Sequence, residues 1–197
     1  MDGTPADSPL AGHLPRIKEV LPHEVNVVEW RSVQDILAEL HAEMQRRQGQ
    51  DHNDAPSIYL CIYGLQRYRL LRKQEESFSF GGGDEEKKTP PDKHFADLLR
   101  EGPSLGIHVI SWIDTPASLE RTLDRGSLRE FDNRILFQMS ANDSSNLIDS
   151  PLANKLGFHR ALAYSEEQGI MEKFRPYALP DKNWLGDVAA RLKSRSG

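Results

Sequence analysis

The chain has 197 residues, of which 38% are hydrophobic and 28% charged, with a formal net charge of −5 and a pI near 5.8. This length favours one domain, or one domain with a small appendage, and the apolar fraction is sufficient for a packed core. The negative charge argues against a module that binds nucleic acid through bulk positive charge, although a few basic residues lining a channel could still do so.

The first half of the chain predicts three elements. Residues 1–23 are rich in proline and glycine, which predicts a flexible arm or linker. A short strand is expected at 25–29, and Ser32 is expected to cap a helix that reaches Arg47. The continuous apolar run 57–63 is typical of a strand buried on both faces.

The second half predicts further helices and strands in alternation. We expect a mobile insertion at 74–91, a helix capped by Asp92 and a buried strand at 106–112. Thr115 followed by proline is a typical helix start. A third strand at 134–139, a hairpin around 166–169 and a C-terminal helix within 181–197 complete the pattern. Residues 24–180 are therefore expected to form an α/β domain with a mainly parallel sheet flanked by helices and a late antiparallel hairpin.

Other features of the sequence exclude whole classes of protein. No apolar run approaches the roughly 18 residues of a membrane-spanning helix, and Met1–Pro5 lack the pattern of a secretory signal. The single cysteine, Cys61, excludes an internal disulfide and a cysteine-based zinc cluster, and the histidines show no metal-ligand spacing. We therefore expect a cytoplasmic protein, or the cytoplasmic part of one, without membrane contact and without a metal site.

Five local strings in the chain occur in the order of a known family. They are Ala42–Arg47, Leu98–Ile110, Asn133–Ser140, Asp143–Asp149 and Leu156–Leu162. Their content and order resemble the C-terminal half of the motor domain of the FtsK/SpoIIIE (HerA-related) P-loop ATPases, over about Pro22 to Pro180. The resemblance implies a RecA-like fold and, in a complete motor, ATP and Mg²⁺ as cofactors.

Three departures from the family concern the chemistry of ATP hydrolysis. The chain has no Gly-Lys pair and hence no phosphate-cradling loop. The family has Asp-Glu at the end of the first buried strand, where this chain has Tyr63-Gly64, and Thr-Gln near the end of the next strand, where this chain has Asp114. We expect that the chain does not hydrolyse ATP by itself and that its partners are the upstream half of the domain or neighbouring ring subunits.

Basic residues supply the remaining candidates. The resemblance implies that Arg134, just before the third strand, reaches a neighbouring subunit's nucleotide as an arginine finger; a surface salt bridge is the alternative. Arg67, Arg69, Arg72 and Lys73 form the densest basic cluster, either a contact for nucleic acid or the solvated face of a helix.

Two functions are compatible with the sequence. The first is the C-terminal part of a ring ATPase that translocates or processes DNA. The second is a degenerate ATPase-like module that binds a protein segment, like the nucleotide-poor modules of type VII secretion motors, with Tyr63, Trp112 and Ile113 in an apolar pocket.

Overall fold

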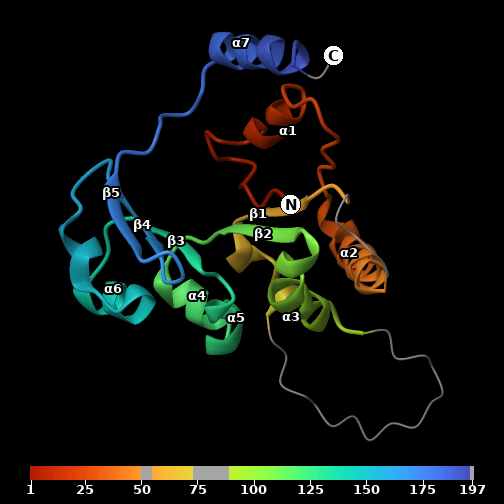
Figure 1. The fold of residues 1–197 in the computed structure, drawn as a ribbon. Coiled ribbons are helices and arrows are strands. Elements are labelled where there is room, and N and C mark those ends of the chain that lie inside the picture. The colour runs from red at the N-terminus through yellow and green to blue at the C-terminus, as the bar shows by residue number, and fades with distance from the viewer. Residues whose placement is uncertain (50–54, 73–88, 196–197) are drawn as a thin grey trace, which may run out of the picture. The chain divides into compact units, whose positions relative to one another are not determined.

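The computed structural model describes residues 1–49, 55–72 and 89–195 (Figure 1). The chain divides into two compact units: unit 1 comprises Met1–Leu128 and Asn183–Gly197, and unit 2 comprises Arg129–Lys182. Lys73 and residues 74–88 of the expected insertion lie outside the described residues.

Unit 1 combines two strands with several helices. The strands are β1 (Ile58–Tyr63) and β2 (Ile107–Trp112). The α-helices are α1 (His13–Lys18), α2 (Val33–Gln48), α3 (Pro91–Glu101) and α4 (Pro116–Thr122). Helices α5 (Arg125–Arg129) and α7 (Lys182–Lys193) also belong to this unit, except for Arg129 and Lys182, which fall in unit 2. Short 3₁₀ turns precede or follow them: η1 (Trp30–Ser32), η2 (Leu65–Arg67), η3 (Arg69–Leu71) and η4 (Pro103–Leu105).

β1 and β2 pair in parallel, which confirms the parallel arrangement expected for these two strands. Their register runs from Ile58 opposite Ile107 to Tyr63 opposite Trp112. On the other edge of β1, Asp2 forms a parallel bridge with Tyr63, whose carbonyl accepts a 2.8 Å hydrogen bond from the Gly3 N–H. Residues 1–3 of the expected arm therefore contact the sheet, a pairing that the proline-rich composition did not predict.

The core of unit 1 lies between the sheet and helices α2 and α3, which pack on each other. Both helices repeat apolar residues at the helical period, so each buries one face. Leu37 in α2, Leu98 in α3 and Ile107 in β2 are completely buried, and α3 contacts β2 directly. One face of the parallel pair is therefore covered by helices.

A buried arginine links α2 to the starts of both strands. The Arg47 side chain is only 2% exposed, and its guanidinium donates to the carbonyls of Leu105 and Pro56 at 2.9 Å each and to the Glu43 carboxylate at 2.8 Å. The glutamate–arginine string that supports the family resemblance thus has a structural role in this chain.

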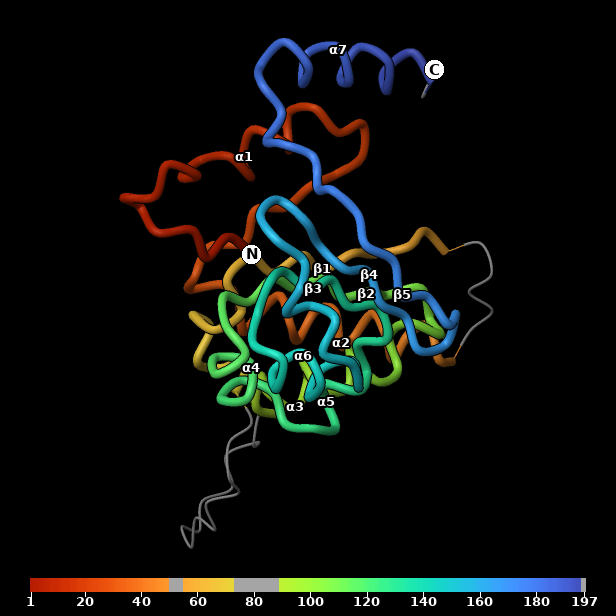
Figure 2. The backbone as a smooth tube through the Cα atoms, turned by 90° about the vertical axis from the view of Figure 1, so that its left-hand side faces the viewer, coloured from red at the N-terminus to blue at the C-terminus, as the bar shows by residue number. Residues whose placement is uncertain are grey.

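Unit 2 is built on an antiparallel sheet. Its strands β3 (Asn133–Leu136), β4 (Ala161–Ser165) and β5 (Ile170–Phe174) pair in the order β3-β4-β5, and both views show β4 and β5 as a hairpin (Figure 1, Figure 2). Helix α6 (Ala141–Ile148) and the turn η5 (Pro151–Lys155) contribute to its core. The core residues are Leu136, Ile148, Ala153, Leu156 and Leu162.

The expectation of a single, mainly parallel sheet is correct only in part. The late antiparallel hairpin is confirmed, but β3 pairs antiparallel with β4 in a sheet separate from β1 and β2. Along β3, Leu136 is buried while Ile135 is 63% exposed, an alternation typical of antiparallel sheets that are covered on one face. The α/β class therefore holds, and the RecA-like single sheet does not describe these strands.

Local signals were correct at one helix start and wrong at another. The Thr115 hydroxyl accepts a 3.1 Å hydrogen bond from the Ser118 N–H, which confirms the predicted cap of α4. Helix α3 begins at Pro91 with Pro90 as its N-cap, so Asp92 lies in the first turn, because proline is well suited to the first helical position. Residues 25–29 form no strand.

Within the described part of the chain, no helix is both long and apolar enough to cross a membrane.

Candidate functional site

The carboxyl ends of β1 and β2 carry two of the sequence-predicted positions. Because the strands are parallel, Tyr63 and Trp112 end at the same edge, where their rings stack with centroids 4.7 Å apart and planes 10° from parallel. The Gly64 N–H donates to the Trp112 carbonyl at 3.1 Å. Ligands of open parallel sheets usually bind at this edge, and here an aromatic pair occupies it.

The residues at this edge do not fit Mg²⁺ and a nucleotide phosphate. Tyr63 and Gly64 offer no carboxylate, and the carboxylate of Asp114 is exposed and accepts a 3.4 Å hydrogen bond from the Thr115 hydroxyl. Over residues 1–49, 55–72 and 89–195, no group of three or more histidine, cysteine, aspartate or glutamate side chains could hold a metal ion. No hydrolytic step can therefore be derived from these side chains.

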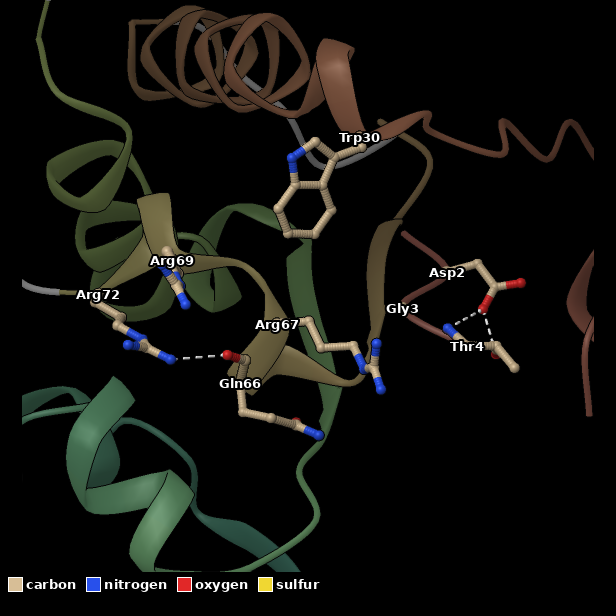
Figure 3. Close-up of a pocket in the computed structure, with 8 residues that line it drawn as sticks. All are labelled: Asp2, Gly3, Thr4, Trp30, Gln66, Arg67, Arg69 and Arg72. Atoms are coloured by element: carbon tan, nitrogen blue, oxygen red, sulfur yellow. Dashed lines mark hydrogen bonds between the residues drawn. The ribbon is translucent and has the colours of Figure 1, made fainter. Parts of the chain in front are cut away.

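A hollow of about 420 Å³ lies beside the carboxyl end of β1 (Figure 3). The N-terminal residues, the turn before α2 and the turns η2 and η3 form its walls. We call it the arginine hollow; its lining residues are Asp2, Gly3, Thr4, Trp30, Gln66, Arg67, Arg69 and Arg72. Three of the four basic residues predicted from the sequence therefore line one cavity.

Cationic side chains outnumber acidic ones in the arginine hollow. Its lining residues include three arginines and a single carboxylate, that of Asp2, in a chain whose overall charge is negative. Arg72 donates from Nη2 to the Gln66 carbonyl at 3.0 Å, but its buried Nε has no hydrogen-bond partner among the described residues. Arginine forks match the geometry of phosphate and carboxylate oxygens.

Trp30 is a lining residue to which the sequence assigned no role. Its ring is 53% exposed and stacks on Tyr68, with centroids 4.7 Å apart and planes 22° from parallel. Burial raises the pKa of Tyr68, the phenol beneath the indole, to about 12. Only the fold could place Trp30 here, because it lies 36 positions before Gln66 in the chain.

Arg134, the candidate arginine finger, lies in unit 2 on β3. Its Nε donates to the Phe131 carbonyl at 2.8 Å, and Nη1 donates to the Leu147 carbonyl. The guanidinium carbon also lies 5.8 Å from the centre of the Tyr164 ring. These contacts give Arg134 a structural role within its unit, and a role in trans stays a prediction.

Comparisons with known proteins give weak likenesses. No family model matches the chain, and no curated protein matches it by sequence. The cytoplasmic domain of the type VII secretion ATPase EccC of Thermomonospora curvata shares 17% identity with it at a TM-score of 0.45, over 93% of this chain and 19% of that one. The genome packaging NTPase B204 of Sulfolobus turreted icosahedral virus 2, solved with sulfate and with AMPPCP, shares 11% identity at a TM-score of 0.44, over 78% of this chain and 74% of that one. The chain thus spans about a fifth of the EccC structure, and TM-scores below 0.5 carry no argument about its function.

Proposed function

We propose that this chain is the C-terminal part of an FtsK/SpoIIIE-type ring ATPase that translocates or processes DNA, and that it does not hydrolyse ATP by itself. In a complete motor, residues outside this chain would hold ATP and Mg²⁺. Its partners would be the upstream half of the domain or neighbouring ring subunits. Five strings in family order and the parallel pairing of β1 with β2 support this proposal.

The arginine hollow is the observation that carries the DNA part of the proposal. Three arginines and an exposed indole line a cavity in an otherwise acidic chain, which suits a phosphodiester backbone with an unstacked base. Local basic residues can attract nucleic acid even where the net charge is negative.

Binding of a labelled single-stranded oligonucleotide to the full chain tests this part. Replacing the two exposed arginines with alanine, Arg67→Ala with Arg69→Ala, should weaken binding by about tenfold or more. The slope of log K against log salt concentration should become shallower by about one to two. Fluorescence anisotropy at several salt concentrations measures both quantities.

The matched control exchanges two other exposed arginines, Arg125→Ala with Arg129→Ala on α5. It should leave affinity and salt dependence nearly unchanged. Equal losses in the two double variants would mean that only overall charge matters, and the DNA role of the hollow would be wrong.

The absence of hydrolysis follows from the aromatic pair at the carboxyl edge. Neither Tyr63 nor Trp112 has a carboxylate to hold Mg²⁺ or to accept the proton of an attacking water. We expect no magnesium-dependent release of phosphate from ATP by the purified chain. Hydrolysis that is lost on a substitution within this chain would contradict the proposal.

The second candidate function is a module that binds a protein segment, and the same aromatic pair favours it. Trp112 is 41% exposed and stacks on Tyr63, so an apolar side chain could dock against either ring. A peptide that raises the unfolding temperature of the chain, where nucleotides and DNA do not, would favour this function over the first.

A further inference from the structure

One face of the parallel pair β1–β2 carries six side chains, none of them a carboxylate, lysine or arginine. Alternate residues of a strand point to the same face, and the register sets them in three opposing pairs. We call this surface the aromatic face; its pairs are Tyr59 with His108, Cys61 with Ile110 and Tyr63 with Trp112. Rings stack at both ends, with centroids 5.1 Å apart in the first pair and 4.7 Å apart in the last.

Side chains of the aromatic face are more exposed than those of the opposite face. Leu60 and Ile62 on the opposite face are at most 6% exposed, but Tyr59 is 59% exposed and Ile110 is 57% exposed. Parallel sheets are normally covered on both faces, almost always by helices. The side that packs toward the core obeys this rule, and the aromatic face does not.

The size of the surface suits one helix better than a second copy of the chain. An aromatic side chain offers about 150–250 Å², so the exposed parts of this face sum to a few hundred Å². A standard interface buries about 800 Å² on each partner, which is more than this face can supply. Strands of six residues are about 20 Å long, the length of a helix of about 13 residues.

The chemistry of the surface limits what can cover it. None of its six side chains is a carboxylate, lysine or arginine, so the surface offers no ion-pair partner to a charged side chain. Apolar side chains lose least when they cover it, so the occupant that fits it best presents an apolar stripe wide enough to touch both strands.

We propose that the aromatic face is the docking surface for a single amphipathic helix of a partner polypeptide, which lays an uncharged apolar stripe over both strands. The face of a helix that repeats leucine at i, i+3, i+4 and i+7 has this form. The inference deepens the second candidate function, because Tyr63 and Trp112 belong to this face, and it holds whether or not the arginine hollow binds DNA.

Cys61 provides a direct test, because it is the only cysteine of the chain and lies exposed in the middle pair. The rate of its alkylation by uncharged N-ethylmaleimide is measured in the full chain. The probe is a synthetic 14-residue helix with leucine at the stripe positions and glutamate and lysine elsewhere. At saturation it should slow alkylation at least tenfold, while a peptide of the same composition with its leucines spread around the helix should not.

Variants of two exposed isoleucines complete the design. Ile110→Glu, or Tyr59→Glu if that chain does not fold by circular dichroism, should abolish the protection of Cys61. Ile135→Glu, which places the same charge at a 63% exposed position on β3, should leave the protection intact.

Four results would overturn the inference. The first two are alkylation that the striped peptide leaves unchanged and loss of protection in Ile135→Glu as well. The third is protection that appears without peptide as the chain concentration rises, which would identify a second copy. The last is faster alkylation in Trp184→Glu without peptide, which would identify the chain's own α7 as the cover.

Discussion

At the residue scale, we expect the stability of unit 1 to depend strongly on the Arg47 side chain. It is a buried cation whose bonds to the Leu105 and Pro56 carbonyls connect three elements. Its partner Glu43 also accepts hydrogen bonds from Arg46. These hydrogen bonds, first that of Arg46 and then that of Arg47, lower the pKa of the Glu43 carboxyl to about 2. The neighbouring arginines thus share one partner, although Arg46 is half-exposed.

Arg47→Met should destabilise the chain by about 2–4 kcal/mol, because it leaves the buried Leu105 carbonyl and the partly buried Pro56 carbonyl without this donor. Arg46→Met should change the free energy of unfolding far less, since exposed ion pairs contribute little. Urea unfolding followed by circular dichroism measures both. Similar costs for the two variants would show that the carbonyl bonds of Arg47 contribute nothing.

At the scale of elements, α2 and α3 meet through a pair of histidines. The rings of His41 and His94 have centroids 4.4 Å apart, and His41 Nε2 lies 3.4 Å from the Asp97 carboxylate. His94 Nδ1 is buried without a hydrogen-bond partner in the described ranges. Burial, and then the neighbouring His41, lower the pKa of His94, and Asp97 partly opposes them.

The lowered pKa of His94 makes stability depend on pH. Its pKa in the unfolded chain is near 6.5, so below this value the unfolded chain binds more protons than the folded chain. The free energy of unfolding should therefore fall as the pH drops from about 7 through the folded pKa, by at most about 1.4 kcal/mol per pH unit for one proton.

Urea midpoints measured between pH 7.5 and 5 check this dependence. His94→Phe, which keeps a ring but cannot be protonated, should flatten the curve in this range. His23→Phe, at an exposed position outside any helix or strand, should keep the slope of the original chain. A slope that survives His94→Phe would assign it to other groups.

At the scale of the whole molecule, each unit has a core of its own. Leu98 and Ile107 are fully buried in unit 1, while Leu136, Ile148 and Leu162 are buried together in unit 2. Leu162→Ala should cost about 2–5 kcal/mol within unit 2. Amides of β3, β4 and β5 should then exchange faster, while those of α2 and α3 keep their rates.

Hydrogen exchange followed by mass spectrometry distinguishes the two units. The reciprocal variant, Leu98→Ala, should accelerate amide exchange in α2 and α3 and leave the exchange rates of the antiparallel sheet unchanged. Acceleration spread evenly over the chain in either variant would mean that the two units unfold as one.

Elements whose signals are local could be predicted from the amino-acid sequence. The apolar run of β1, the helical period of α2, the cap at Thr115 and the hairpin between β4 and β5 all depend on neighbouring residues. The aromatic and glycine positions at the end of β1 were likewise visible as departures from a family pattern.

Features that join residues far apart in the chain became visible in the folded structure alone. Sequence periodicity does not specify which strand β3 pairs with, that Trp30 lines a hollow with Arg67, or that Arg47 reaches the Leu105 carbonyl. An unbroken apolar run also predicted that both faces of β1 are buried, whereas Tyr59 is exposed. The physical reason is that burial and long-range pairing depend on what the rest of the chain places against a strand, which no local pattern records.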